Sequence, residues 1–269
     1  MARAIRDAGY EAVQGADAAP YAEAGLIVYG ADCIGVPHEA RKVLQAQRAG
    51  GFRATTLHLG TGLENDSEAL RLIDATLSAS AQLDQPVLIE THRATLTQDI
   101  WRTLRWIEFF PELRFNADLS HWYTGHAMPY GDFTAKLDLL GPVFARTGFI
   151  HGRIGTQSSM QVSIGVGHRD EPHLSHFRAM WKLCFEGFLR SARPTDRLPF
   201  LPELLPSTAE GPEGTVHMEY ANLQFDRDGQ IDEVVDRWEQ ASILTRIAED
   251  LFAAVTDDLA AVMGEGRRE

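Results

Sequence analysis

Four short apolar runs in the sequence each end in a side chain that can bind a metal ion or carry a proton. In chain order, these end residues are Glu90, Asp118, His151 and Glu203. In folds built on parallel strands, the carboxyl ends of the strands meet on one side of the sheet. Three carboxylates gathered there would repel one another and raise each other's pKa, and a divalent cation would remove most of that conflict. The pattern therefore predicts a metal site.

The mixture of ligand types narrows the choice of ion, because three carboxylates and one imidazole suit Mn²⁺, Mg²⁺, Co²⁺ or Zn²⁺. A single polar residue at a strand end is more often a helix cap or a loop hydrogen bond, but four in succession favour a site. The fourth ligand has a rival, Glu219, in a strand-like run over residues 216–220. We prefer Glu203 because its run directly follows a strong helical pattern. Residues 204–215 are too short and too rich in proline and glycine to form a helix between two successive strands.

Side chains near these runs are candidates for holding a substrate. Arg153 lies two residues after His151, so a strand would point both side chains to the same face. His58 ends another apolar run and is either a substrate contact or a buried, hydrogen-bonded histidine. His92 lies just beyond Glu90 and either supports the metal ligands or makes loop bonds.

A long glycine-containing segment over residues 155–172 follows the run that ends near His151. Loops of this kind often close over active sites. Gln161 is therefore a candidate substrate contact, as are His168 and Arg169. The alternative is that these residues belong to a solvated surface turn.

The elements that must position these residues alternate between strand-like and helical patterns, which is typical of βα units around a parallel sheet. Strands are expected at residues 11–14, 26–29, 53–59, 86–90, 114–118, 148–153 and 197–203. Helices are expected at residues 3–8, 38–48, 98–110, 133–145 and 231–255, and a further helix would be capped by Asp66 or Ser67. An apolar stripe predicts one more helix, formed by Phe177, Met180, Trp181, Cys184, Phe185 and Phe188. The last helix would carry Trp238, Leu244 and Val255 on its apolar face.

These seven strands are one fewer than the eight of a closed (β/α)8 barrel. The expected fold is therefore an α/β, TIM-barrel-like (β/α)8 fold that lacks its first β-strand, before the helix at residue 3. The alternative is a strand overlooked within residues 14–35. A missing strand would expose two sheet edges, which a loop, a helix or a partner would have to cover.

Composition limits the classes of protein that the chain can belong to. Its 269 residues, 44% of them apolar, suffice for one large domain over residues 1–269. A net charge of −13 argues against a nucleic-acid partner, which requires a basic face. No apolar run is long enough to span a membrane, no signal peptide is visible, and Cys184 is expected to be buried. We therefore expect a cytoplasmic protein.

At the four strand ends, the sequence resembles the xylose-isomerase-like sugar isomerase/epimerase superfamily. The strongest segments are Glu90-Thr91-His92-Arg93, Ala117-Asp118-Leu119-Ser120-His121-Trp122, Ile150-His151-Gly152-Arg153-Ile154-Gly155 and Pro202-Glu203-Leu204-Leu205-Pro206. The resemblance covers essentially the whole length except a first strand. It implies that Glu90, Asp118, His151 and Glu203 bind the metal. It also implies that His121 of the Asp-x-x-His pattern and Arg153 contact the substrate. An insert-like stretch after the last strand departs from the pattern.

The function that follows is a metal-dependent sugar isomerase or epimerase acting on a small sugar or sugar derivative. Glu90 and Glu203 would flank a carbon next to a carbonyl, one removing its proton and the other returning one. A sugar or polyol dehydratase and a non-catalytic sugar-binding barrel are the alternatives. A DNA-repair endonuclease is disfavoured by the acidic charge. Relatives often pair, which leaves a homo-oligomer open.

Overall fold

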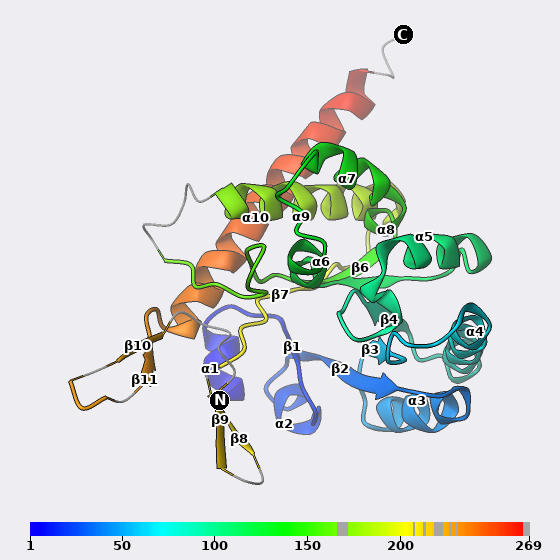
Figure 1. The fold of residues 1–269 in the computed structure, drawn as a ribbon, viewed down its shortest axis with the longest axis horizontal. Helices are drawn as coiled ribbons and strands as arrows, with labels where there is room; N and C mark the ends of the chain where they lie inside the picture. Colours follow the sequence, from blue (N-terminus) through cyan, green and yellow to red (C-terminus); the bar gives the residue numbers. More distant parts are fainter. Residues whose placement is uncertain are drawn as a thin grey trace. The chain divides into compact units, whose positions relative to one another are not determined.

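The computed structural model describes residues 1–165, 172–206, 208–211, 214–217, 223–225, 227–229 and 231–265. Its main sheet contains seven parallel strands, and neighbours in the sheet are also neighbours in the sequence (Figure 1). This is the topology of a TIM barrel. The strands are β1 (Ala12–Gln14), β2 (Ile27–Ile34), β3 (Thr55–Leu59), β4 (Val87–Glu90), β5 (Phe115–Ala117), β6 (Thr147–His151) and β7 (Phe200–Leu201).

Helices separate successive strands, as the alternation in the sequence predicts. They are α1 (Ala2–Asp7), α2 (Ala19–Ala22), α3 (Ala40–Ala49), α4 (Asp66–Leu83), α5 (Ile100–Phe109), α6 (Leu119–Gly125), α7 (Phe133–Leu139), α8 (Gly141–Phe144), α9 (Pro172–Ser191) and α10 (Arg237–Glu265). Two 3-10 turns, η1 (Pro37–Glu39) and η2 (Leu96–Gln98), precede α3 and α5. Within the described residues, no helix is both long and apolar enough to cross a membrane.

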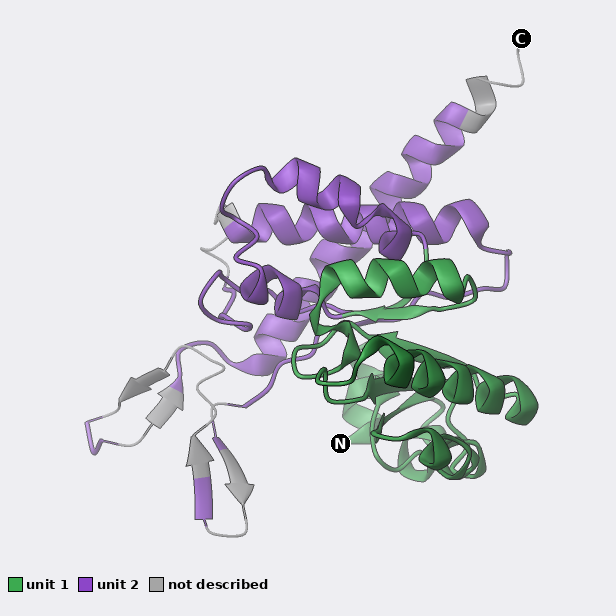
Figure 2. Ribbon diagram, turned by 45° about the vertical axis from the view of Figure 1, so that its right-hand side comes forward, with its two compact units in different colours: residues 1–117, 146–149 green, residues 118–145, 150–269 purple. Residues whose placement is uncertain are grey.

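The chain forms two compact units, which are coloured separately in Figure 2. The first comprises residues 1–117 and 146–149, and the second comprises residues 118–145 and 150–269. Strand β6 begins in the first unit and ends in the second. A single domain over residues 1–269 remains a prediction.

In the first unit, parallel strands β1 to β5 are joined by helices, of which α3, α4 and α5 bury one face and the short α2 buries no residue. Helix α4 buries residues that recur every three or four positions: Ala69, Leu72, Ile73, Thr76 and Ala79. Its N-cap is Asn65, which makes a reciprocal capping box with Glu68. The expected caps Asp66 and Ser67 are wrong, because the helix begins one residue earlier than that assignment requires.

In the second unit, helices α9 and α10 pack against each other. The predicted stripe on α9 is confirmed for Phe177, Met180, Trp181, Cys184 and Phe185, which are buried, while Phe188 at its end is only partly buried. The ring of Trp181 meets Phe200 of β7 edge to face at 5.1 Å between centroids. Phe185 meets Phe252 of α10 in the same manner at 5.3 Å. Aromatic packing therefore holds the short strand β7 close to the helices that follow and precede it.

Three expectations at the C-terminal end of the chain differ from the structure. Residues 231–233 form strand β11 (Ile231–Glu233), which pairs with β10 (Leu223–Phe225), so helix α10 begins at Arg237. Trp238 is 48% exposed and does not share the buried face of Leu244 and Val255. Strand β7 contains only two residues, because prolines on both sides cannot donate ladder hydrogen bonds.

The stretch after β7 does not add a strand to the main sheet. Strands β8 (Thr208–Gly211) and β9 (Gly214–His217) form an antiparallel hairpin in a sheet of their own. The run containing Glu219 therefore does not begin as a strand of the main sheet, and the choice of Glu203 as the fourth ligand stays a prediction. Glu219 itself lies outside the described residues, as do His168 and Arg169.

Candidate active site

Asp118 follows strand β5 directly and begins helix α6 as its N-cap. Its Oδ1 accepts hydrogen bonds from the backbone nitrogen of Ser120 at 3.2 Å and from Ser120 Oγ at 2.5 Å. Its Oδ2 accepts from Arg153 Nη2 at 2.5 Å. Helix α6 was not expected from the sequence, although an aspartate after a strand is itself a capping signal. The cap fixes the carboxylate before any ligand binds.

Arg153 is fully buried and connects several polar groups of the second unit. Its Nε donates to Ser120 Oγ at 2.9 Å, and Nη2 lies 2.9 Å from His121 Nε2. Its Nη1 lies 3.1 Å from Glu203 Oε2. The guanidinium therefore bridges two carboxylates, Asp118 and Glu203, and neutralises part of their charge. A metal ion is consequently not the sole means of relieving this repulsion, contrary to the electrostatic argument made from the sequence.

The imidazole of His151, at the end of β6, lies between the same two carboxylates. Its Nδ1 is 3.7 Å from Asp118 Oδ2 and 3.3 Å from Glu203 Oε2. The side chains of Asp118 and His151 are buried, whereas that of Glu203 is 25% exposed. Of these three groups, Glu203 is thus the most accessible to a molecule arriving from solvent.

The pKa of Asp118 reflects opposing effects. Burial by itself would raise the pKa, but the charge of Arg153, followed by His121 and His151, holds it well below its usual range. His121 Nε2 lies 3.5 Å from Asp118 Oδ2. Asp118 is therefore an anion at neutral pH and suits the role of a ligand better than that of a proton donor.

Glu90 ends strand β4 in the first unit and has different partners. Its Oε1 lies 3.1 Å from His58 Nε2 of β3, and its Oε2 accepts from Asn116 Nδ2 at 2.9 Å. Glu90 and Asn116 are register partners in the paired strands β4 and β5, which explains the second contact. The carboxylate is buried, while the His58 side chain is 38% exposed.

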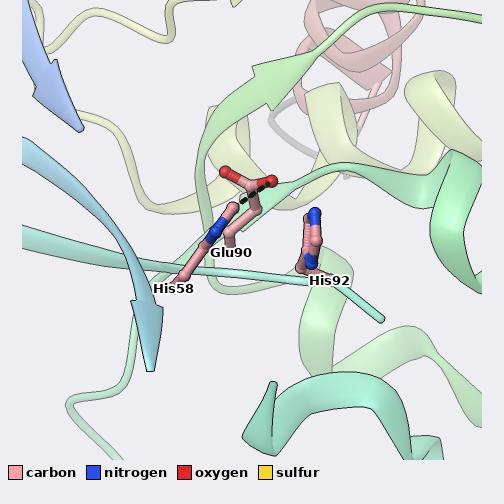
Figure 3. A group of neighbouring side chains, drawn as sticks. All are labelled: His58, Glu90 and His92. Atoms are coloured by element: carbon pink, nitrogen blue, oxygen red, sulfur yellow. Dashed lines mark hydrogen bonds and ion pairs between the residues drawn. The ribbon is translucent and has the colours of Figure 1, made fainter. Parts of the chain in front are cut away.

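A second imidazole, His92, completes this group (Figure 3). The rings of His58 and His92 lie 4.0 Å apart between centroids, tilted by 35°. Among the described residues, His58, Glu90 and His92 offer ligand atoms that all lie within 4.8 Å of one another. The contact with Glu90 agrees with a hydrogen-bonded His58, but the side chain is 38% exposed and not buried as that interpretation required, and a role toward a substrate stays a prediction.

Gln161 makes two hydrogen bonds that bind its own segment to the one after β7. Its Nε2 donates to Leu205 O and its Oε1 accepts from Leu205 N, each at 2.9 Å. Leu205 lies two residues after Glu203, so Gln161 helps to position that carboxylate. The predicted substrate contact of Gln161 is untested, but the side chain is buried and is not part of a solvated turn.

Two polar residues that sequence reasoning missed, Ser120 and Asn116, are central to these arrangements. Ser120 connects Asp118 to Arg153, and Asn116 donates to Glu90. Neither residue lies at the end of an apolar run, the position that marks the candidate ligands in the sequence. Asn116 could have been found from the strand pairing, and Ser120 from its place in the first turn of a capped helix.

Comparisons with known proteins bear on the fold. No protein-family model and no curated protein match the sequence. Among solved structures, a xylose isomerase-like TIM barrel protein from Mycobacterium smegmatis, in complex with magnesium, is similar with a TM-score of 0.54 and 9% identity. That similarity covers 94% of this chain and 88% of the other.

Two further structures are similar at lower TM-scores. A xylose isomerase domain protein from Planctomyces limnophilus has a TM-score of 0.49 and 18% identity, covering 74% of this chain and 82% of the other. The probable 3-DHS dehydratase AsbF from Bacillus anthracis, involved in petrobactin synthesis, has a TM-score of 0.46 and 16% identity, covering 75% of this chain and 85% of the other. At these identities, what is shared is the fold. Together with the parallel strand order, the Mycobacterium smegmatis structure indicates that this chain has the xylose isomerase-like TIM-barrel fold.

Proposed function

We propose that the chain is a divalent-metal-dependent sugar isomerase or epimerase whose ligands are Glu90, Asp118, His151 and Glu203. The observation that carries the proposal is the position of His151 Nδ1, 3.7 Å from Asp118 Oδ2 and 3.3 Å from Glu203 Oε2. Ligand atoms about 2.1 Å from one ion, at right angles, are about 3 Å apart. The separations therefore suit atoms that share an ion.

The donor set fits a hard or borderline divalent ion. Glu90, Asp118 and His151 are buried and have ligand atoms of the required types. The hydrogen bonds that Asp118 accepts leave further lone pairs, because a carboxylate has about four acceptor positions. The similarly folded Mycobacterium smegmatis protein is in complex with magnesium, which favours an ion of this kind. When bound, such an ion would polarise neighbouring oxygens of a sugar and make the adjacent carbon more acidic.

The side chains of the chain itself would move the proton. Glu90 and Glu203 are the two carboxylates proposed to exchange it with substrate carbon. Glu203 Oε2 lies next to Arg153 Nη1 and is partly exposed, and Glu90 Oε1 lies next to His58 Nε2. Arg153 and His121 would hold substrate oxygens, while Ser120 keeps the guanidinium in place.

Proton exchange from sugar carbon into D₂O tests the proposal. Wild-type protein loaded with Mn²⁺ or Mg²⁺ is incubated with a panel of aldoses and ketoses, and NMR follows deuterium at carbon. We expect exchange with at least one sugar, and a product that differs from the substrate's isomer only by the deuterium at carbon, with no loss of water. Loss of water from the product would instead identify a dehydratase. No exchange by the metal-loaded protein with any sugar would contradict an isomerase or epimerase.

A substitution then assigns the proton carrier. Glu203→Gln is expected to keep part of the metal affinity and to reduce exchange by about 100-fold or more, within the range for general acid–base groups. Glu108→Gln, at an exposed site on α5, is the matched control and should exchange as wild type does. Undiminished exchange by Glu203→Gln would refute the role of Glu203.

A further inference from the structure

The cluster of His58, Glu90 and His92 in the first unit contains two imidazoles that the proposed function does not use as metal ligands. His58 comes from β3, Glu90 ends β4, and His92 lies two residues beyond it (Figure 3). The three residues thus reach one place from two adjacent strands and the loop that follows the second. Their side chains combine two neutral nitrogen donors and one carboxylate, a set that Zn²⁺ and Co²⁺ accept.

The distances within the cluster suit one small ion. His58 Nε2 and Glu90 Oε1 are 3.1 Å apart, close to the roughly 3 Å separation of two ligands on one ion. One ligand atom from each of the three residues lies within 4.8 Å of the others. Glu90 is buried, whereas the side chain of His58 is 38% exposed, so an ion could enter from the histidine side.

Neighbouring groups hold these side chains in position. Asn116 Nδ2 donates to Glu90 Oε2 at 2.9 Å, so the amide orients the carboxylate from the side opposite His58. His92 Nδ1 contacts the carbonyl oxygen of Arg93. A hydrogen on Nδ1 would make this contact a hydrogen bond and would leave Nε2 as the ligand atom of the ring. In metal sites, a hydrogen bond from the other ring nitrogen commonly fixes the orientation of a ligating histidine.

The loop that carries His92 is also held by hydrogen bonds. Thr97 Oγ1 donates to the Glu90 carbonyl oxygen at 2.5 Å and accepts from the His92 backbone nitrogen at 2.9 Å. Thr95 Oγ1 donates to the His92 carbonyl oxygen at 2.8 Å. The imidazole of His92 is therefore presented by a fixed backbone, so little ordering is needed when an ion binds.

We propose that His58, Glu90 and His92 form a binding site for a transition-metal ion of the Zn²⁺ or Co²⁺ type, separate from the ion proposed at Asp118 and His151. This proposal rests on the distances among His58, Glu90 and His92 in the first unit, and it does not depend on the proposed isomerase activity. If both ions bind, Glu90 serves both.

Metal binding by the full-length, untagged protein tests the site. After removal of metal with a chelator, Co²⁺ is titrated and its visible absorption recorded, and bound Zn²⁺ is counted after dialysis. We expect His58→Ala and His92→Ala each to lose one equivalent of ion relative to wild type. The affinity should fall by more than the roughly 10–100-fold that follows loss of an outer partner. His38→Ala, at an exposed position in η1, is the matched control and should bind as wild type does.

Further variants separate this site from the one in the proposed function. Asp118→Asn should keep the ion at His58 and His92 and lose the other. If Asp118→Asn binds like wild type while the histidine variants lose an equivalent, the proposed function fails and this site stands. His92→Gln replaces His92→Ala if the alanine variant does not give the urea midpoint of a folded protein. Unchanged Co²⁺ spectra and Zn²⁺ stoichiometry in both histidine variants would overturn the site.

Discussion

Glu90 and Asp118 follow neighbouring strands, yet the groups that compensate their charges differ in kind. Asp118 accepts from the guanidinium of Arg153, whose charge is permanent. Glu90 is contacted by an imidazole, His58, and by the amide of Asn116, and neither of these two groups carries a permanent charge. The first arrangement fixes an anion in place. The second holds a carboxylate through one imidazole and one amide.

This difference suggests a division of labour between the two carboxylates. The pKa of Asp118, held low mainly by Arg153 against the effect of burial, makes it a poor proton carrier. Glu90 Oε1 lies 3.1 Å from Nε2 of His58, whose side chain is 38% exposed. We therefore expect proton transfer to depend on Glu90 and His58. We expect the stability of the buried Asp118 anion in the second unit to depend on Arg153.

The largest effect is expected when the permanent charge is removed by Arg153→Leu. Asp118 would then keep only the Ser120 donors and the neighbouring imidazoles, and breaking a buried ion pair by removing one partner costs about 3–5 kcal/mol of unfolding free energy. The urea midpoint at pH 7 measures the loss, with Arg105→Leu, at an exposed site on α5, as the control. Added Mn²⁺ should raise the midpoint of Arg153→Leu more than that of wild type, since an ion can replace the lost charge. If Arg153→Leu were as stable as wild type without metal, Arg153 would not be the group that stabilises the buried Asp118 carboxylate.

The corresponding change at Glu90 should cost less, because an amide and not a charge is lost. Asn116→Ala leaves the buried Glu90 Oε2 without this donor and is expected to lower the unfolding free energy by about 1–3 kcal/mol. Asn65→Ala, which removes the α4 cap, is the matched asparagine control at about 1 kcal/mol. If Asn116→Ala lost more unfolding free energy than Arg153→Leu, the amide at Glu90 would matter more for stability than the guanidinium at Asp118, contrary to expectation.

The elements that carry both carboxylates were predictable because their patterns are regular. The strand that ends at Glu90 is a short apolar run, and elsewhere the stripe on α9 repeats at helical spacing over more than two turns. Helix α6 was missed because its seven residues mix polar and apolar types with no repeat. Trp238 fits the apolar periodicity of α10 but lies in its first turn, where the structure leaves it half exposed.

At the candidate site, the residue types at strand ends could be predicted from the sequence, but the contacts between their side chains could not. Arg153 was expected to bind a substrate, and its contacts to Asp118 and Glu203 depend on a tertiary arrangement that one sequence does not specify. His92 and His58 approach one another because β3 and β4 are adjacent and the loop after Glu90 turns back. Such a meeting follows from register and loop geometry and not from spacing.

A smaller effect is expected at Gln161, which secures the segment that bears Glu203. Gln161→Ala removes two hydrogen bonds to Leu205 and should lower the unfolding free energy by about 1–2 kcal/mol. Because the carboxylate is repositioned and not removed, metal affinity should fall while some proton exchange persists. Exchange abolished as fully as by Glu203→Gln would indicate that Gln161 itself contacts the substrate.

The smallest effect concerns Glu64, a carboxylate compensated neither by a guanidinium nor by an imidazole. Burial tends to raise its pKa, but hydrogen bonds from the backbone nitrogens of Thr61 and Gly62 and from Thr61 Oγ1 lower it overall. A lowered folded pKa gives stability that is complete above the unfolded value of about 4.3 and is lost as pH falls through the folded value. Glu64→Gln should therefore lower the unfolding free energy by about 1 kcal/mol or less at pH 7 and hardly at all at pH 3. Urea titrations at both pH values, beside the exposed control Glu112→Gln, measure the difference. If Glu64→Gln lost the same unfolding free energy at pH 3 as at pH 7, the stabilisation would not depend on the charge of the Glu64 carboxylate.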